Sequence, residues 1–592
     1  MVARSRPVPQ GASSSEAYPF PLLGRNLDSS LSTVRGSRSR LRDQRCASYQ
    51  VPVPEACQRP RTSAEEEPIG NRVNRVPESS ATPKTAGVRT RGVLGRLTRI
   101  ESHPMPPLDW MDARSVARFD APDTPDAEDR VEEILRSLNE AQREAVVYGD
   151  GPMLILAGAG SGKTRAITSR IAYLVATARA APHEILAITF TNKAAREMRD
   201  RVERAMGERG MWISTFHSLC ARILRRDIEG RGPWTRDFTI YDTSDRNLLL
   251  RTLTKELGYD TQRFRPQMLA SWISEEKTRR FDRGGGEVGS EDGSLEMEVF
   301  VRVRDRYRAA MRANNALDFD DLLVETLTLF EEHPGVRDQY ARRFRHVLVD
   351  EYQDTNRIQY LLVRHLAGHH GNLAVCGDPD QSIYAWRGAD IQNILDFEED
   401  FAGGGLTPVK VVKLERNYRS TACILGAAQG LIEHNRSRKE KNLVTDRESD
   451  DRVVVVECAD ENDEANEIAA RIQALVKEGV AADSIAIFYR VNFMQRALER
   501  SLRFSGIPYQ IVGGVEFYQR REVRDLVSYL HLIVNPKDDV ACRRVLNVPS
   551  RGIGDRSVER LSNWAAGRGV SLLAAVRSEE ARSEIRGRAK KS

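Results

Sequence analysis

Short apolar runs recur along the middle of the chain, and each one ends in a polar or glycine-rich turn. The runs that begin at Met153, Ile185 and Val347 are short and continuously apolar, which is typical of buried strands. Stretches with apolar residues every three to four positions follow them and indicate helices. Strands that alternate with helices in this way predict an α/β fold built on parallel sheets.

Two regions interrupt this alternation. Residues 229–316 contain helical segments and a GGGEVGSEDGS loop at 284–294 but no strand pattern. We therefore expect a helical insertion that divides a first domain into two parts, 128–228 and 317–410. Residues 1–127 show neither the strand period of 2 nor the helix period of 3.6, and 13 of the 25 prolines occur by residue 107, which predicts a disordered extension.

Three interpretations of this extension remain open. It is an arm that touches nucleic acid, a transit peptide rich in Arg and Ser, or an untranslated stretch before a true start at Met105 or Met111. The first 100 residues hold 17 Lys and Arg against 8 Asp and Glu, a net charge of +9, which leaves −4 for the rest of the chain. A nucleic-acid groove in the folded part is therefore a local patch and does not follow from the overall charge.

Length and composition limit the class of protein. A chain of 592 residues is expected to form several domains, because single cores stop growing near ~250 to 300 residues. No apolar run approaches the ~18 residues of a membrane span, so we expect a soluble, intracellular protein with no membrane partner. The seven cysteines are scattered singly, which favours reduced thiols over metal ligands.

The most informative stretch is MLILAGAGSGKT at residues 153–164, a strand that breaks into a glycine-rich turn before a helix. Such a turn binds phosphate, because glycines let successive backbone N–H groups point inward and the helix directs its positive end at the same anion. Lys163 adds a point charge, and Thr164 offers a hydroxyl to Mg²⁺. The strict pattern has Gly where this chain has Ala157. The candidate nucleotide-binding residues of the turn are Ala157, Gly158, Ala159, Gly160, Ser161, Gly162, Lys163, Thr164 and Arg165.

A second motif, HVLVDEYQDTN at 346–356, places two carboxylates at the end of a buried strand. Parallel sheets bind their ligands at this end of the strands. Asp350 is placed to hold Mg²⁺ through water, and Glu351 is placed to orient or deprotonate the attacking water. Together, the two motifs predict a P-loop NTPase in which Lys163 and Glu351 act in catalysis.

Three further polar residues complete the candidate nucleotide site. The Gln142 amide can donate and accept hydrogen bonds together, which suits the adenine edge, although such a residue is more often a surface residue. Gln381, in the polar loop after the apolar run near 374, can sense the γ-phosphate. Arg419, in VVKLERNYRST, can reach the same phosphate from a second domain and couple hydrolysis to domain closure.

Aromatic and polar residues at other turns indicate a nucleic-acid surface. Tyr384 and Trp386 alternate with Arg387 in a loop flanked by Gly and Asp, where base stacking is favoured over a core position. Phe190, at the end of a strand, is either core or a stacking platform. Turns that lead from strands into helices form anion sites that suit backbone phosphates. The candidate DNA-binding residues are Phe190, Thr191, Asn192, Thr215, His217, Tyr384 and Trp386.

Seven motifs stand in the order of a known family: LNEAQ, AGAGSGKT, TFTNKAAREM, STFHS, VDEYQDTN, GDPDQSIYAWRGA and LERNYRS. From about residue 136 to at least residue 554, the chain resembles the UvrD, Rep and PcrA group of superfamily 1 DNA helicases. The resemblance implies two RecA-like domains with Mg²⁺-ATP between them and single-stranded DNA across their top, along which the protein moves 3′ to 5′. The implied fold class is an α/β P-loop NTPase with RecA-like parallel sheets and helical insertions.

The same resemblance implies a role for each matching residue. Gln142 would contact adenine, and Tyr418 would stack on it. The residues implied around the phosphates and Mg²⁺ are Lys163, Thr164, Asp350, Glu351, Gln381 and Arg419. Phe190, Tyr384 and Trp386 would stack on DNA bases. Arg387 would join the γ-phosphate side of the site to the DNA side.

The resemblance also divides the rest of the chain. Residues 411–548 look like a second RecA-like domain with strands at 452–459, 484–492 and 506–517, and residues 549–592 look like the start of a second helical insertion. Family members continue into a His…Lys-Gly-Leu-Glu-Phe motif and a final arginine motif, which this sequence does not contain. We therefore expect a C-terminally truncated member whose second sheet has unpaired edges and an uncovered apolar face.

Two functions remain open at this point. The first is an ATP-dependent 3′-5′ DNA helicase or translocase that acts on single-stranded and duplex DNA in repair or replication, in the bacterial cytoplasm at the nucleoid, with a possible protein partner. The second is an ATP- and DNA-binding fragment with little turnover. A P-loop ATPase that acts on protein is disfavoured, because the aromatic loops suit nucleic acid.

Overall fold

The computed structural model describes residues 48–50, 125–207, 210–281, 294–402, 408–512 and 519–583. Contacts divide the chain into two compact units, and all described residues belong to the unit made of Met1–Pro52 and Asp123–Ser592. The other unit, Val53–Pro122, lies outside the described residues, as does nearly all of the extension predicted to be disordered.

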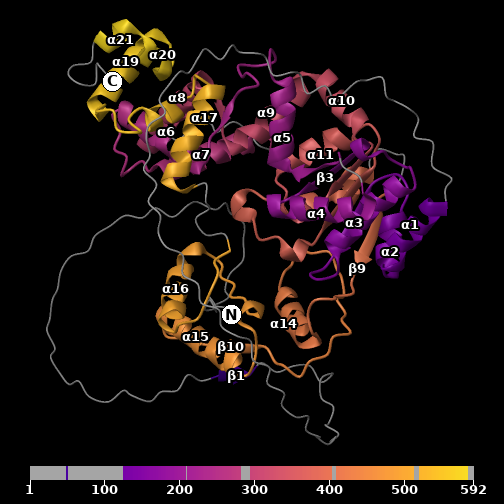
Figure 1. Cartoon of the computed structure of the whole chain (residues 1–592). Coiled ribbons are helices and arrows are strands. Elements are labelled where there is room, and N and C mark those ends of the chain that lie inside the picture. The colour runs from indigo at the N-terminus through magenta and orange to yellow at the C-terminus, as the bar shows by residue number, and fades with distance from the viewer. Residues whose placement is uncertain are drawn as a thin grey trace, which may run out of the picture. The chain divides into compact units, whose positions relative to one another are not determined.

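Six parallel strands form the main sheet, and two of them, β3 and β9, are labelled in Figure 1. Their order is β4-β3-β7-β8-β2-β9, and every neighbouring pair is parallel. Strands β2, β3, β7 and β8 are buried along their whole length, which explains their continuously apolar sequences. The predicted α/β class is confirmed. The strands are β2 (Met153–Ala157), β3 (Ile185–Thr189), β4 (Trp212–Thr215), β7 (His346–Val349), β8 (Leu373–Gly377) and β9 (Lys410–Leu414).

Helices cover both faces of this sheet, because successive side chains on a strand point to opposite sides. Ile155 packs into one hydrophobic core and Leu154 into the other. The Ile155 core contains side chains from α2 (Glu140–Val147), α3 (Lys163–Ala176) and α4 (Asn192–Met206). The Leu154 core contains side chains from α5 (Phe216–Asp227), α9 (Phe319–Glu332), α10 (Pro334–Arg343), α11 (Arg357–Ala367), α12 (Gln392–Leu395) and α13 (Phe397–Ala402). Helix α1 (Pro125–Arg136) precedes them in the chain.

The predicted helical insertion contains α6 (Thr243–Glu256), α7 (Pro266–Arg279) and α8 (Leu295–Ala313), and its glycine-rich loop lies almost wholly outside the described residues. The pattern missed a short parallel pair, β5 (Thr239–Ile240) with β6 (Ala316–Leu317). Strands of two residues are too short to show a period. The insertion shares the Leu154 core, so it is packed as part of the first domain.

The pairing of strand β9 contradicts one expected domain boundary. The sequence placed residues 411 onward in a second domain, but β9 pairs with β2, Lys410 opposite Met153 and Leu414 opposite Ala157. β9 is therefore an edge strand of the first sheet, and the first domain extends at least to Leu414. An apolar run does not indicate which sheet it joins, so the hydrophobic pattern did not locate this domain boundary.

The region after β9 contains fewer strands than predicted. Its described elements are α14 (Ala422–Ile432), β10 (Val454–Val456), α15 (Glu461–Lys477) and α16 (Gln495–Phe504). Only the first of the three predicted strands is present, as β10. The prediction was wrong for 484–492 and for the described part of 506–517, where no described segment forms a ladder with them. A strand exists only beside a hydrogen-bonded neighbour, which sequence alternation does not supply.

Strand β10 has an unexpected partner and uncovered apolar neighbours. It pairs antiparallel with β1 (Ser48–Gln50), which lies inside the extension predicted to be disordered. In the same region Phe488, Phe504 and Val512 are 93%, 94% and 85% exposed. This agrees with the expectation of an uncovered apolar face in the second domain.

The last described part of the chain is helical. Tyr241 in the insertion donates from Oη to Asp538 Oδ1 over 2.8 Å, and Asn535 Nδ2 donates to Thr239 Oγ1 over 3.0 Å. Residues near 535, which the sequence assigned to the second domain, are therefore docked on the insertion. None of the helices described here is both long and apolar enough to cross a membrane. The helices are α17 (Arg521–Val534), α18 (Asp539–Val545), α19 (Asp555–Arg568), α20 (Leu572–Arg577) and α21 (Glu579–Ser583).

Candidate nucleotide and DNA site

The turn after β2 curls tightly and requires two of its glycines. Gly160 has a φ of +70°, and Gly162, the N-cap of α3, has a φ of +88°, in the left-handed region that favours glycine. A Cβ on Gly162 would lie 2.6 Å from Gln142 Nε2, and one on Gly160 would lie 2.7 Å from Arg419 Cβ. Ala157, in contrast, still belongs to strand β2 and is fully buried, so an alanine fits where the strict pattern has glycine.

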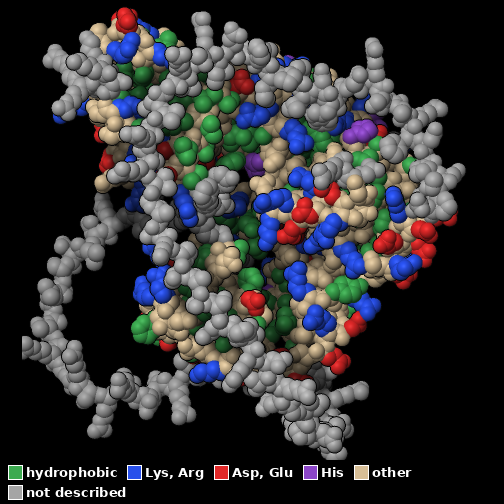
Figure 2. Space-filling view, viewed as in Figure 1, with side chains coloured by type: hydrophobic (Ala, Val, Ile, Leu, Met, Phe, Trp, Pro, Cys, Tyr) green, Lys and Arg blue, Asp and Glu red, His purple; other side chains and the backbone are tan. Residues whose placement is uncertain are grey.

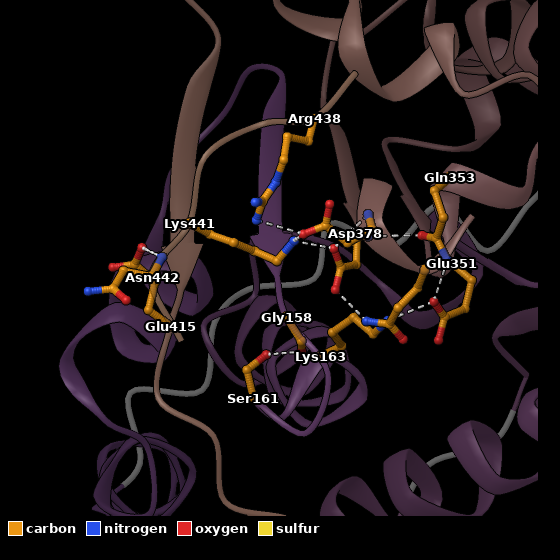
Figure 3. Close-up of polar contacts among 12 residues, drawn as sticks. Gly158, Ser161, Lys163, Glu351, Gln353, Asp378, Glu415, Arg438, Lys441 and Asn442 are labelled. Atoms are coloured by element: carbon orange, nitrogen blue, oxygen red, sulfur yellow. Dashed lines mark hydrogen bonds and ion pairs between the residues drawn. The ribbon is translucent and has the colours of Figure 1, made fainter. Parts of the chain in front are cut away.

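Lys163 begins α3, and its amine contacts two other predicted site residues, Glu351 (Figure 3) and Gln381. Nζ is 2.8 Å from Glu351 Oε2 and 3.3 Å from Gln381 Oε1. Burial alone would lower the pKa of Lys163, but the neighbouring Glu351 carboxylate outweighs it, and the pKa is raised. The structure thus brings together a charged amine, a carboxylate and an amide, which follow the neighbouring strands β2, β7 and β8.

Thr164 and Asp350 meet at the end of the same turn. Thr164 Oγ1 donates to Asp350 Oδ2 over 3.4 Å, and Asp350 is 5% exposed. Burial, followed by the charge of Glu351, raises the pKa of Asp350 to about 6. Hydroxyl and carboxylate oxygens are donors that Mg²⁺ prefers, and a nearby cation would favour the ionised carboxylate. The two residues therefore fit the predicted Mg²⁺ site.

Glu351 is held in an uncommon backbone conformation. Its φ of +53° and ψ of +45° lie in the left-handed region, which few residues other than glycine adopt. Oε2 accepts a hydrogen bond from Gln353 Nε2 over 2.9 Å, and Gln353 Oε1 accepts from the backbone N–H of Asp378 over 3.0 Å. Gln353 therefore ties Glu351 to the end of β8. Residues fixed in this way are common at functional sites.

Residues 417–419 follow β9 directly and lie against the turn. Asn417 Nδ2 donates to Ala159 O over 2.6 Å, and Tyr418 N donates to Gly160 O over 2.9 Å. Asn417 Oδ1 also accepts from the backbone N–H of Arg419 over 2.8 Å. The Arg419 side chain is exposed beside the turn, so the structure brings it close to the predicted phosphate site.

The predicted adenine contacts, Gln142 and Tyr418, lie on either side of Asn139. Tyr418 Oη accepts from Asn139 Nδ2 over 2.7 Å, and Gln142 Oε1 accepts from Asn139 N over 3.3 Å. Gln142 Nε2 donates to Ser161 O over 2.9 Å, and the residue is 2% exposed. The Gln142 amide therefore supports the turn, and its contact with adenine stays a prediction. Arg165, on α3, is exposed.

Three predicted base-stacking residues form one group, the aromatic cluster of Phe190, Tyr384 and Trp386. The Phe190 and Tyr384 rings stack with their centroids 4.9 Å apart, and the Trp386 centroid lies 6.4 Å from that of Tyr384. Trp386 is 63% exposed despite its apolar ring. Arg387 Cζ lies 4.6 Å from the Trp386 ring centroid, so Arg387 joins the cluster. Open aromatic faces beside arginine suit the stacking of bases.

A second arginine approaches the aromatic cluster from the region after β9. Arg490 Cζ lies 6.0 Å from the Trp386 centroid, and its NH2 group donates to Ile383 O over 3.3 Å. Lys and Arg side chains are interspersed with Asp and Glu on the face seen in Figure 2. Arg387 and Arg490 are thus the two cations placed against the Trp386 ring among the described residues.

The polar DNA-contact candidates lie at the carboxyl ends of β3 and β4. Thr191 and Thr215 cap α4 and α5, and each hydroxyl accepts from a backbone N–H three residues on, over 3.1 and 3.3 Å. Thr215 Oγ1 also lies 3.4 Å from Asn192 Oδ1, so the two turns meet. The His217 ring contacts the Phe319 ring edge to face, with the centroids 5.8 Å apart, and burial lowers the pKa of His217.

Comparison with known sequences places this site in a family. The sequence model of the UvrD/REP helicase N-terminal domain matches residues 138–402, and that of the UvrD-like helicase C-terminal domain matches residues 412–584. The chain belongs to the UvrD-like helicase family. The motifs and the site described above lie within the residues that the two models match.

Curated relatives of this UvrD-like chain are named as helicases. The ATP-dependent DNA helicase UvrD1 of Mycobacterium tuberculosis (strain ATCC 25618 / H37Rv) is 47% identical over 455 residues, which cover 74% of this chain and 58% of the relative. The ATP-dependent DNA helicase PcrA of Bacillus subtilis (strain 168) is 45% identical over 447 residues, which cover 75% and 59%. The chain thus spans about three fifths of the length of the curated relatives it matches.

Four residues of this UvrD-like site escaped the sequence analysis: Gln353, Asn417, Phe319 and Arg490. Gln353 and Asn417 stand inside VDEYQDTN and LERNYRS, and an amide between charged site residues was a usable signal. Phe319 and Arg490 stand in stretches that look like a helix start and a strand. Only their contacts with His217 and Trp386 connect them with the site.

Proposed function

We propose that the chain hydrolyses ATP and uses it to move 3′ to 5′ along single-stranded DNA, as an ATP-dependent DNA helicase or translocase. One observation carries this proposal: the loop after β8 touches both parts of the site. Gln381 lies 3.3 Å from Lys163, and Tyr384, further along the loop, stacks on Phe190. A displacement at the terminal phosphate would therefore reach a base-stacking ring through a few residues of one loop.

In the proposed reaction, water attacks the terminal phosphate beside Lys163. Glu351 orients this water and accepts its proton. The charged Lys163 amine and the Arg419 guanidinium balance the negative charge that develops on the phosphoryl oxygens. Gln381, within hydrogen-bond distance of Lys163, is placed to sense whether that phosphate is present.

The remaining nucleotide contacts come from the turn and its neighbours. Thr164 and Asp350 would hold Mg²⁺, which when bound neutralises charge on the phosphate oxygens. The backbone N–H groups of residues 157–165 would cradle the phosphates. Gln142 and Tyr418 would take the adenine, and we infer that ATP binds between the first domain and a second RecA-like domain that follows β9.

On the DNA side, bases would stack on Phe190, Tyr384 and Trp386 without reading sequence. Arg387 would link the two halves of the site. The turns at the ends of β3 and β4 would contact the phosphate backbone through helix N-termini and hydroxyl groups. The residues proposed for this contact are Thr191, Asn192, Thr215 and His217.

The names of the relatives support the wider setting. They are named ATP-dependent DNA helicases, and by similarity we propose single-stranded and duplex DNA as the substrates of this chain. We further propose a role in DNA repair or replication in the bacterial cytoplasm, at the nucleoid, together with a protein partner. The proposed activity would separate the two strands of duplex DNA.

The decisive experiment is ATP hydrolysis by the 592-residue chain with and without single-stranded DNA, with Glu351→Gln as the blank. We expect Mg²⁺-dependent hydrolysis that DNA stimulates and that the variant abolishes. Binding of ATP and DNA without turnover would instead assign the chain to the fragment class. Polarity follows from a second assay, in which 3′-to-5′ movement displaces streptavidin from a biotin at the 5′ end and spares one at the 3′ end.

A further inference from the structure

A buried cluster of opposite charges lies beside the proposed nucleotide site. Residues 438–443, the basic strap, cross the loop that follows β8 (Figure 3). Lys441 Nζ is 2.5 Å from Asp378 Oδ1 and also pairs with Asp380 Oδ2, and the Lys441 and Asp378 side chains are each only 2% exposed. Arg438 pairs with the same Asp380 oxygen at 3.1 Å.

A buried cluster of charges of this kind contributes little to the stability of the fold. Removing several charges from water costs free energy that their attraction only partly returns, so apolar side chains of similar size hold two segments together at least as well. A buried lysine does add something that an apolar residue cannot. It fixes the direction of the carboxylate oxygens that it contacts.

That direction matters because Asp378 also holds Gln381. Gln381 Nε2 donates to Asp378 Oδ2 over 2.5 Å, and Gln381 Oε1 accepts from Lys163 Nζ over 3.3 Å. A carboxylate only accepts hydrogen bonds, so Asp378 forces the NH₂ end of the amide toward itself and the oxygen toward Lys163. An unbroken series of contacts therefore joins Lys441, Asp378, Gln381 and Lys163.

The basic strap also contacts the phosphate-binding turn. A Cβ on Gly158 would collide with Leu443, so the Leu443 side chain lies directly on the turn. The strap is held in turn by the chain after β9, since Asn442 N donates to Glu415 Oε1 over 2.7 Å and Gln429 Nε2 donates to Leu443 O over 3.1 Å. The basic strap thus contacts both the segment after β9 and, through Asp378 and Gly158, the first domain.

We propose that Lys441 is a positioning residue for ATP hydrolysis. It fixes Asp378, and through Asp378 it orients the Gln381 amide beside the terminal phosphate, so that seating of the basic strap sets the phosphate sensor. The inference rests on the proposed function, because it assigns Gln381 to that phosphate. It adds a residue that neither the motifs nor the comparisons mark.

The chain offers a matched control two residues away. Lys439 pairs with Glu398, so it also fastens the basic strap to the first domain, but it makes no contact with Asp378 or Gln381. Its side chain is 19% exposed and that of Glu398 46%, compared with 2% for Lys441. Lys439→Met therefore weakens the docking of the strap while it leaves the contact between Lys441 and Asp378 in place.

The experiment measures hydrolysis and binding for Lys441→Met, Gln381→Ala, the double variant, Lys441→Arg and Lys439→Met. We expect Lys441→Met to lower kcat by about tenfold with little change in KM for ATP, because the amide loses its orientation and not its binding surface. In the Gln381→Ala background, Lys441→Met should add less than about a twofold loss, since the two residues act in series. Lys441→Arg should recover part of kcat, and Lys439→Met should stay within about twofold of the unmodified chain.

A second measurement does not depend on turnover. The ratio of ADP to ATP dissociation constants reports whether the site senses the terminal phosphate, and Lys441→Met and Gln381→Ala should reduce this ratio by the same factor. If the chain fails to hydrolyse ATP but shows this shared reduction, the proposed function fails, and the orientation of the Gln381 phosphate sensor by Lys441 stands. Losses that multiply in the double variant, an equal loss in Lys439→Met, or an unchanged ratio would each overturn the inference.

Discussion

Gln353 donates from Nε2 over 2.9 Å to Oε2 of Glu351, the same oxygen that Lys163 contacts, and thereby holds the proposed catalytic carboxylate. Because Gln353 is 1% exposed and its other amide end accepts from the Asp378 backbone, it has little freedom to move. The direction of the Glu351 carboxylate is therefore set by a buried neighbour that makes no contact with nucleotide in the proposed mechanism.

We expect Gln353→Ala to lower kcat for ATP hydrolysis by about 10- to 100-fold while changing KM for ATP by little, because a misplaced base costs rate and not binding. Steady-state hydrolysis with saturating single-stranded DNA checks this. The matched control is Gln359→Ala, another buried amide, whose side chain caps α11. Equal losses of kcat in the two variants would mean that the effect is one of stability.

The phosphate-binding turn is tested by adding a single methyl group. In Gly162→Ala, the new Cβ would lie 2.6 Å from Gln142 Nε2 at a φ of +88°, so we expect ATP affinity to fall at least about tenfold. Gly207→Ala is the control, since Gly207 has a φ of +69° but nothing within 4 Å of an added Cβ. It should cost about 1 kcal/mol of unfolding free energy and leave ATP affinity unchanged. Titration calorimetry and urea unfolding separate the two effects.

Asp350 should weaken the fold at neutral pH. Its pKa is raised to about 6 by burial and by Glu351, compared with 3.8 in the unfolded chain, so between these values the folded state holds more protons. Stability contributed by this group is therefore lost as the pH rises from about 4 to about 6. Without Mg²⁺, Asp350→Asn should raise the unfolding free energy by roughly 1–3 kcal/mol at pH 7.5 and by little at pH 4.

Thermal unfolding of both proteins in EDTA at the two pH values measures this difference. The surface variant Asp483→Asn should leave Tm unchanged at both. Mg²⁺-dependent hydrolysis should disappear in Asp350→Asn despite the gain in stability. If Asp350→Asn were less stable than the unmodified chain at pH 7.5, the inference that the buried Asp350 carboxylate destabilises the fold would be wrong.

The aromatic cluster should carry most of the affinity for bases. Trp386→Ala should weaken single-stranded DNA binding by about 10- to 100-fold, the worth of one stacked base, and should leave the salt dependence unchanged. Arg490→Ala should instead make the log–log salt slope shallower by about 0.7, if it meets one phosphate. Phe504→Ala, at an aromatic ring that is 94% exposed outside the cluster, should have neither effect. Fluorescence anisotropy at several salt concentrations distinguishes these results.

The sequence predicted the first sheet and its site well because both depend on local signals. The turn from β2 into α3, the carboxylates after β7 and the loop after β8 are marked by glycine, charge and an apolar run. Since parallel strands end at one edge, their polar ends had to converge, and Lys163, Glu351 and Gln381 do so.

What the sequence did not predict depends on partners that are distant in the chain. Residues 411–414 were assigned to the second domain, although β9 pairs with β2, because an apolar run fits either domain. The segments at 484–492 and 506–512 alternate like strands but have no ladder partner among the described residues. Arg490 and Lys441 are connected with the site only by their contacts with Trp386 and Asp378, which no period or spacing can express.

The pairing of β9 with β2 has a mechanical consequence. Leu414 ends β9 opposite Ala157, and Gly158 N donates to Leu414 O over 3.4 Å, so the nucleotide turn and the arginine-bearing segment leave the sheet side by side from two parallel strands. A pull on the chain after Leu414, directed along the strand, would load all hydrogen bonds of this pair in shear, and they would have to break together. The joint between the two regions thus resists tension along the strand axis, and the hydrogen bonds from Asn417 to Ala159 and from Tyr418 to Gly160 fasten the segment that follows to the same turn.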